Sequence, residues 1–223
     1  MSNHNLQAIA RAAADVFRGT NPLLVRSIFR LMRLLLDGEP VSAERFASSA
    51  GIPREVAREV LARLRSWGAE FDEEGNVVGA GLTLVPTPHR YEVDGHRFYT
   101  WCALDAIVFP LVFGHTAAIA SPDPVSGETI RLTIGPLGVE SVEPDHAVVS
   151  SRSAGFATED VRGSICQYGH FFASRDTASA YTTLHRGAPL AILAPEEAFR
   201  IGQLVLEEEP LKSIAEVRDE DRK

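Results

Sequence analysis

The sequence is poor in cysteine: Cys102 and Cys166 are its only two thiols among 223 residues. Two thiols are too few for a disulfide-stapled scaffold, a four-cysteine zinc site or an iron–sulfur cluster. Four arrangements remain open at this point. They are inert core thiols, one disulfide, a redox pair, and a two-thiolate site for a soft metal.

Long hydrophobic runs are also missing. The stretch Ala103–Phe113 is the longest candidate, and Asp105 interrupts it, whereas a membrane helix needs roughly 18 to 20 apolar residues. The first residues lack the basic segment and apolar segment of a secretory signal. We therefore expect a cytoplasmic protein, in which thiols stay reduced and a structural disulfide is disfavoured.

Positive charge is in short supply. The chain has 22 basic and 30 acidic residues, for a formal net charge of −8. Proteins that bind DNA or anionic membranes use a surplus of Lys and Arg to neutralise phosphates. We therefore expect neither a nucleic acid nor a membrane as partner. The hydrophobic and charged fractions, 45% and 23%, are typical of a globular protein.

The first 85 residues have the pattern of a winged helix-turn-helix. Apolar periodicity and capping signals predict helices at 5–17, 22–38, 42–50 and 53–65. A polar turn at 72–76 then precedes two short strands, at 77–78 and 82–84. Residues 1–90 contain 11 arginines and 10 acidic residues, which is a weak electrostatic footprint for a DNA-binding element. We favour a helical subdomain that packs on the rest of the protein over one that contacts DNA.

The second part of the chain alternates short strands with helices. Asp94-Gly95 between two apolar segments predicts a hairpin. The remaining predictions are a helix containing 101–108, helices at 176–185 and 195–208, and strands at 115–120, 128–134, 138–142, 147–151, 166–173 and 190–193. The charged end, Arg218–Lys223, predicts disorder.

Cys102 lies at a predicted helix start. With Thr100 as the cap, the thiol would sit in the first turn, where free backbone N–H groups and the helix dipole lower a thiol pKa. Asp105 is three residues further on and shares the helix face. A thiolate and a carboxylate would then face one space, as a nucleophile or soft-metal ligand beside a proton carrier. The alternative is an inert buried cysteine, which is common.

Cys166 and His170 are four residues apart in the second cysteine segment. On a strand they would face the same side, and with Cys102 they would make a Cys₂His set. No fourth ligand is evident, and closed zinc sites need four. A hydrogen-bonded core histidine is the alternative for His170.

Several blocks of the sequence, taken together, resemble one family. The segment Arg97–Asp105, followed by Phe109-Pro110, resembles the core motif of organomercurial (alkylmercury) lyases. Cys166–Ser174 is similar to the family's second cysteine motif, and segments 75–84 and 197–203 also resemble family members. The blocks occur in the family's order and span about residues 20–206, nearly the whole chain.

The resemblance implies a function and a set of site residues. The function is protonolytic cleavage of R-Hg-X to R-H and Hg(II), in mercury detoxification. The implied residues are Cys102 and Cys166 as mercury ligands and Asp105 as proton carrier and third ligand. No cofactor is implied, because mercury enters with the substrate, whereas external thiols or a mercuric reductase would take the product. Gln167 and Asp123-Pro124 stand where some members have further cysteines, which leaves any accessory thiol role open.

The resemblance also implies an α+β fold. A winged-helix-like helical subdomain (1–85) would pack on a catalytic α+β domain with antiparallel sheets (86–210), followed by a charged tail (211–223). The candidates for lining an apolar substrate pocket are aromatic: Phe98, Tyr99, Trp101 and Phe171. A monomer or a homodimer is compatible with the sequence. Two other functions stay open, a soft-metal-sensing winged-helix regulator and a protein that sequesters Hg(II) without turnover.

Overall fold

The computed structural model describes residues 3–18, 21–154, 160–187 and 189–214. Its helical segments are α1 (Asn3–Ala14), η1 (Asp15–Phe17), α2 (Pro22–Leu35), α3 (Ala43–Ala50), α4 (Arg54–Ser66), α5 (Ala103–Phe113), α6 (Val161–Ser164), η2 (Cys166–Tyr168), α7 (Arg175–Leu184), α8 (Pro195–Leu206) and η3 (Leu211–Ser213). Its strands are β1 (Glu70–Phe71), β2 (Val77–Ala80), β3 (Leu82–Thr83), β4 (His89–Val93), β5 (His96–Thr100), β6 (Ala117–Pro122), β7 (Thr129–Gly135), β8 (Gly138–Glu143), β9 (Val148–Arg152), β10 (Phe171–Phe172) and β11 (Leu190–Leu193).

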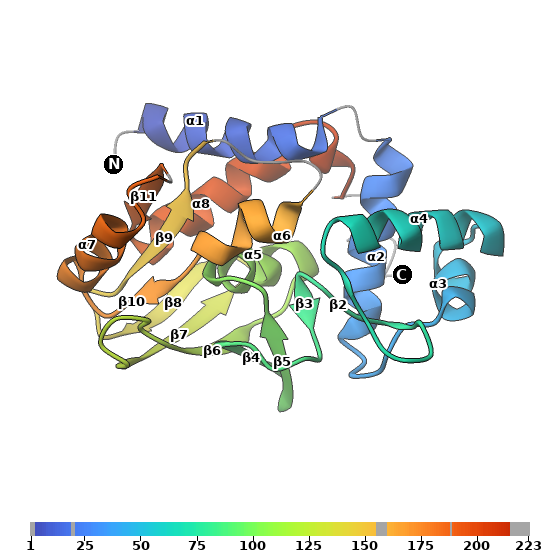
Figure 1. Ribbon diagram of the computed structural model, residues 1–223, viewed down its shortest axis with the longest axis horizontal. Coiled ribbons are helices and arrows are strands. Elements are labelled where there is room, and N and C mark those ends of the chain that lie inside the picture. Colours follow the sequence, from blue (N-terminus) through green and yellow to red (C-terminus); the bar gives the residue numbers. More distant parts are fainter. Residues whose placement is uncertain (1–2, 19–20, 155–159, 188, 215–223) are drawn as a thin grey trace.

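Two antiparallel sheets form the body of the protein. The larger has eight strands in the order β1-β2-β3-β5-β4-β6-β7-β8, and the smaller has the order β10-β9-β11. Helix α5 lies on one face of the large sheet, and α8 and α1 are stacked beyond it (Figure 1). Exposed and buried residues alternate along β7, as expected when only one sheet face is covered. The predicted α+β class with antiparallel sheets is confirmed.

Helix α3 begins and ends where local signals predicted, whereas α2 ends at Leu35, short of the predicted end near residue 38. The hydroxyl of Ser42 caps α3 by accepting a hydrogen bond from the Arg45 backbone N–H at 3.2 Å. Gly51 ends the same helix in the left-handed conformation, with φ of +62°. The wing, β1 and β2, continues into the large sheet because β3 pairs with both β2 and β5. The predicted domain boundary at residue 85 stays a prediction.

Several arginines of α4 contact neighbouring side chains at the surface of the protein. Arg54 forms an ion pair with Glu44 on α3. The guanidinium of Arg63 lies 5.9 Å from the Trp67 ring centroid, and that of Arg65 lies 3.7 Å from the Phe71 ring. All three arginines stay exposed, so their charges remain at the surface of the helix. The opposite face of α4 is buried in the main core through Ala57, Val60, Leu61 and Leu64, which favours the packing role that we predicted for the helical subdomain.

The C-terminal end is packed further than we expected. Leu211 and Ile214 are buried in the core, so the packed part of the chain extends beyond residue 210, where the predicted tail begins. The segment predicted to be disordered, Arg218–Lys223, lies outside the described residues. No helix in the described part of the chain has the length and apolar character needed to cross a membrane.

The contact between α8 and α5 depends on Gly202. A Cβ atom at this position would lie 2.7 Å from Cγ2 of Val108 on α5, closer than packed carbons approach. We expect Gly202→Ala to lower the free energy of unfolding by about 1 to 2 kcal/mol, because overpacking outweighs the better helix propensity of alanine. Denaturant titration measures this. The control is Gly187→Ala, where no heavy atom lies within 4 Å of the added Cβ. Equal stability of the two variants would contradict the tight contact.

Candidate active site

Cys102 forms the N-terminal cap of α5. Its backbone is extended, with φ of −149°, and its sulfur accepts a hydrogen bond from the Asp105 backbone N–H, with N and S 3.5 Å apart. The helix therefore begins at Ala103, and the prediction that Thr100 is the cap is wrong. Thr100 ends β5 instead, and its hydroxyl donates to the Cys102 carbonyl at 2.9 Å. The thiol of Cys102 is held by the first turn without being part of it.

Cys166 lies in a short turn, and the strand predicted over 166–173 is wrong for its first half. The backbone turns because the Tyr168 N–H donates to Ile165 O at 3.1 Å and the Gly169 N–H donates to Cys166 O at 3.0 Å. Gly169 then meets the other cysteine segment. Its carbonyl accepts from the Ala103 N–H at 3.0 Å, and a Cβ at Gly169 would lie 2.9 Å from Cβ of Cys102. A glycine is needed here for close approach.

The structure brings the three predicted site residues together. The sulfurs of Cys102 and Cys166 and a carboxylate oxygen of Asp105 all lie within 4.8 Å of one another. The Cys166 thiol donates to Asp105 Oδ2 at 3.8 Å. Two thiolates on one metal ion, each bound at about 2.3 Å, are roughly 4 to 4.6 Å apart. The three groups can therefore share one soft ion, and within the described residues no other group of three or more His, Cys, Asp and Glu side chains is as closely placed.

Burial favours the protonated forms of the three site residues. It raises the pKa of Asp105 to about 6, although hydrogen bonds from Cys102 and Cys166 and the charge of Arg162 partly lower it. The hydrogen bond with Cys166 lowers the pKa of Cys102, but burial and the Asp105 charge together raise it above its ordinary value. The hydrogen bond with Cys102 and burial raise the pKa of Cys166 well above its ordinary value. Our prediction of a lowered pKa for Cys102 is therefore wrong.

Two family models match the chain. Residues 8–81 match the helix-turn-helix domain of alkylmercury lyase, and residues 82–207 match alkylmercury lyase itself. An alkylmercury lyase of Staphylococcus epidermidis is 45% identical over 181 residues, which cover 79% of this chain and 80% of that protein.

The chain belongs to the alkylmercury lyase family.

Other members of the family are similarly close. The alkylmercury lyase of Bacillus cereus is 42% identical over 89% of each chain, and that of Pseudomonas putida is 39% identical over 87% of this chain and 90% of its own. The crystal structure of the mercury-bound form of MerB2 superposes with a TM-score of 0.78 at 20% identity, over 95% of this chain and 100% of that chain. At that identity the likeness shows a shared fold.

An apolar cavity of about 210 Å³ adjoins the three site residues in this alkylmercury lyase family member. Of the four aromatic residues that we predicted for its lining, only Trp101 lines it. Phe98 and Phe171 are buried in the core instead, and Tyr99 is half-buried on β5. The other aromatic lining residues are Phe17, Phe29, Trp67 and Phe109. Sequence reasoning missed these residues because they lie in helices or directly after one. Apolar residues at such positions usually belong to an ordinary hydrophobic core.

The predicted Cys₂His arrangement does not form within the described residues. His170 Nε2 is hydrogen-bonded to the Gln167 carbonyl at 3.0 Å, and its ring packs against Tyr181 with centroids 5.1 Å apart. His170 is therefore the hydrogen-bonded histidine of the alternative interpretation. The reason is the turn at 166–168, which replaces the strand that would have aligned it with Cys166.

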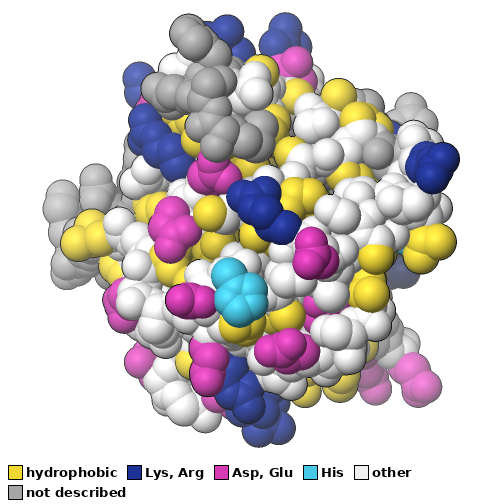
Figure 2. Space-filling view, turned by 90° about the vertical axis from the view of Figure 1, so that its left-hand side faces the viewer, with side chains coloured by type: hydrophobic (Ala, Val, Ile, Leu, Met, Phe, Trp, Pro, Cys, Tyr) yellow, Lys and Arg dark blue, Asp and Glu magenta, His cyan; other side chains and the backbone are white. Residues whose placement is uncertain are grey.

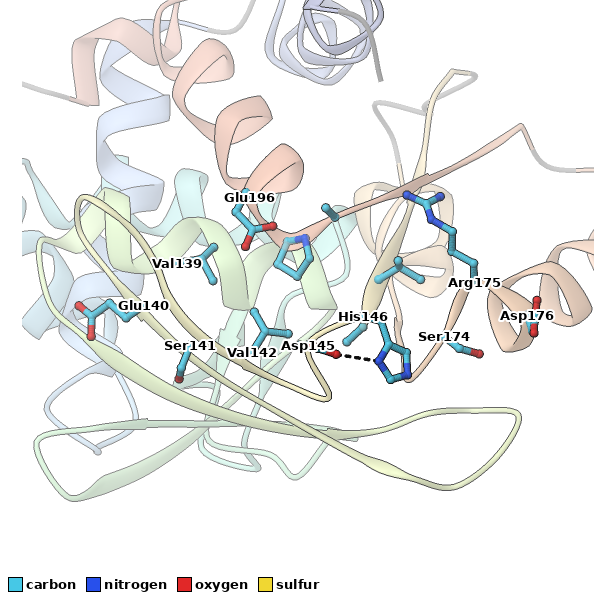
Figure 3. A pocket seen from close by; sticks show the side chains of 14 residues that line it. Val139, Glu140, Ser141, Val142, Asp145, His146, Ser174, Arg175, Asp176 and Glu196 are labelled. Atoms are coloured by element: carbon cyan, nitrogen blue, oxygen red, sulfur yellow. Dashed lines mark hydrogen bonds and ion pairs between the residues drawn. The ribbon is translucent and has the colours of Figure 1, made fainter.

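A larger hollow of about 630 Å³ lies elsewhere, between β8 and the first turns of α7 and α8 (Figure 3). His146 and Asp145 contact each other there at 2.9 Å, and both side chains are largely exposed. From the α7 side of the molecule, acidic side chains surround a histidine on the surface (Figure 2). No cysteine lines this hollow, and both thiols lie at the smaller, apolar cavity.

Sequence reasoning also missed two charged residues near the site. The charge of Arg162 lowers the pKa of both Asp105 and Cys166. Glu70 holds Arg162 through an ion pair at 2.9 Å, between residues 92 positions apart. The sequence offers a weak signal for Arg162, which precedes Cys166 by four residues, and none for Glu70.

Proposed function

We propose that the protein cleaves the carbon–mercury bond of organomercurials R-Hg-X and releases R-H and Hg(II). One observation carries the proposal: two thiols and a carboxylate meet within 4.8 Å at an apolar cavity. Mercury(II) is a soft cation and prefers thiolate ligands, while an alkyl or aryl group prefers apolar surroundings. Membership of the alkylmercury lyase family agrees with this chemistry.

In the first step, one thiol replaces X on mercury. A cysteine sulfur forms a bond to mercury, X leaves as its conjugate acid HX with the thiol proton, and Cys-S-Hg-R remains. Both thiols are buried with raised pKa values, so they enter the reaction as S–H groups. Their deprotonation is therefore coupled to mercury binding, and a nearby base assists it.

In the second step, the other thiol binds mercury and gives up its proton to Asp105. The Cys166 thiol already donates to Asp105 Oδ2 at 3.8 Å. Two thiolates raise the electron density on mercury and make the bound carbon more basic. Asp105 then delivers its proton to that carbon, the carbon–mercury electron pair forms the C–H bond, and R-H leaves. A pKa of about 6 suits a group that must accept and then release a proton near neutral pH.

The product is Hg(II) held by Cys102 and Cys166, with Asp105 as the third ligand. We propose that external thiols remove it, directly or by transfer to a mercuric reductase, because buried thiolates bind a soft ion strongly. No cofactor takes part in these steps. The two thiols and the carboxylate balance all the protons that the reaction requires.

Release of hydrocarbon tests the function. We expect the purified protein, incubated with phenylmercury and excess thiol, to release benzene over many turnovers, measured by gas chromatography of the headspace. The cavity of about 210 Å³ has room for a phenyl group, since a cavity of about 150 Å³ admits benzene. Mercury retained on the protein without benzene would contradict the proposal and favour the sequestering function.

A further inference from the structure

Glu70 lies on the first strand of the wing and contacts Trp101, which lines the cavity. Its side chain is only 18% exposed. In the sheet, Glu70 is paired with Gly79, and Gly79 with Thr83. A Cβ at Gly79 would overlap both the Glu70 carboxylate and the Thr83 hydroxyl, so the glycine makes room for the carboxylate to lie across the strands. Thr83 Oγ1 donates to Glu70 Oε2 at 2.6 Å and fixes its orientation.

This one carboxylate joins the two segments that contain the thiols. Its Oε2 atom accepts from the indole Nε1–H of Trp101 at 3.0 Å, and Trp101 directly precedes Cys102. Its Oε1 atom accepts from Arg162 Nη1 at 2.9 Å. Arg162 is in α6, the short helix that leads into the Cys166 turn. The two segments are therefore connected at Glu70, as well as through Gly169 beside the sulfurs.

The three side chains form one interlocked group. The Arg162 guanidinium lies over the Trp101 ring, 4.8 Å from its centroid, which is a favourable cation–π distance. The backbone N–H of Trp101 donates to Gly81 O at 2.8 Å, so hydrogen bonds fix both the backbone and the side chain of this residue. Exposed ion pairs contribute little to a structure, but this carboxylate is largely buried and accepts three side-chain hydrogen bonds. These bonds fix Trp101 and Arg162 relative to each other.

We infer that Glu70 is a positioning residue that sets the spacing of the Cys102 and Cys166 sulfurs through Trp101 and Arg162, an inference that rests on the proposed function. Both thiolates must bind one mercury atom before the carbon is protonated. Small displacements of reacting groups slow such steps strongly. Capture of the substrate by the first thiol needs only one sulfur and is less sensitive to the spacing. Glu70 therefore acts on turnover more than on substrate capture.

The test compares Glu70→Gln and Glu70→Ala with a matched control, Glu73→Gln. Glu73 is an exposed residue in the turn of the same hairpin, so its variant removes the same charge. With phenylmercury as substrate, we expect kcat to fall about tenfold in Glu70→Gln and about thirtyfold in Glu70→Ala, with KM within about threefold of the wild-type value. Glutamine has the milder effect because it still accepts from Trp101. The control changes neither constant by more than about twofold.

A second measurement uses Hg(II) alone and needs no turnover. We expect the concentration of a competing thiol that removes half of the bound Hg(II) to be about tenfold lower for Glu70→Ala than for the wild type. The reason is that two displaced sulfurs bind the ion less strongly. If the wild type holds Hg(II) but releases no benzene, the proposed function fails and this measurement alone decides the role of Glu70. If Glu70→Ala does not fold, Glu70→Gln decides. Folded variants with lower thermal stability but wild-type kcat and mercury retention would overturn the inference.

Discussion

Replacement of Cys166 by alanine is expected to abolish benzene release from phenylmercury, with a loss in kcat of about a thousandfold or more. Losses of that scale occur when one member of a catalytic group that acts as a unit is removed. With one thiolate, mercury keeps its organic group, because its carbon does not become basic enough to accept the proton. Cys166 is buried at 6% exposure and has no second cysteine beside it, since residue 167 is glutamine. No neighbouring thiol can replace it.

Single-turnover benzene release and steady-state kinetics measure the effect. Cys102→Ala should lose as much activity as Cys166→Ala, and the double variant should be no worse than either single variant. Circular dichroism and thermal unfolding of each variant check that the fold is kept. A Cys166→Ala variant that turns over at more than about a tenth of the wild-type rate would refute the two-thiolate mechanism, because one sulfur on mercury would then be sufficient for turnover.

Asp105→Asn is expected to bind the organomercurial and release hydrocarbon about 10² to 10⁴ times more slowly, the usual effect of removing a general acid or base. Both sulfurs remain, so mercury still binds, but asparagine neither accepts the Cys166 proton nor delivers one to carbon. Mercury content after gel filtration measures binding, and headspace benzene measures turnover. Unchanged turnover would exclude Asp105 as the proton carrier. Lost binding with normal folding would assign it to mercury ligation alone.

The same variant has a pH-dependent effect on stability. Burial raises the pKa of Asp105 from 3.8 to about 6 in the folded protein. The stability associated with this shift is therefore present below pH 3.8 and is lost as the pH rises through 6. Asp105→Asn has no such loss, so its stability relative to wild type should increase by roughly 2 to 3 kcal/mol between pH 4 and pH 8. Urea unfolding of both proteins at pH 4 and pH 8 measures this. If the variant and the wild type differ in unfolding free energy by the same amount at both pH values, the raised pKa is contradicted.

Most elements of the fold could be predicted from local signals. Ser42 and Gly51 bound α3 as their capping preferences require, and the predicted strands over 115–151 lie within about two residues of β6 to β9. The errors fall where a distant contact decides the local structure. Gly169 meets Ala103 and Cys102, and the backbone around Cys166 turns to allow this. The alternation of residue types that predicted a strand over 166–173 gives no information about that contact.

The sequence by itself indicated the family, through several motifs in order, and predicted the three candidate site residues. Only the tertiary structure decided that Cys102 and Asp105 meet Cys166, which is 61 positions beyond Asp105. It also decided that both thiols have raised pKa values, and that Glu70 and Arg162 connect the two cysteine segments. The physical reason is the range in sequence over which each interaction acts. Caps, turns and motif spacing depend on neighbours within a few residues, whereas burial and charge depend on segments that the fold brings together.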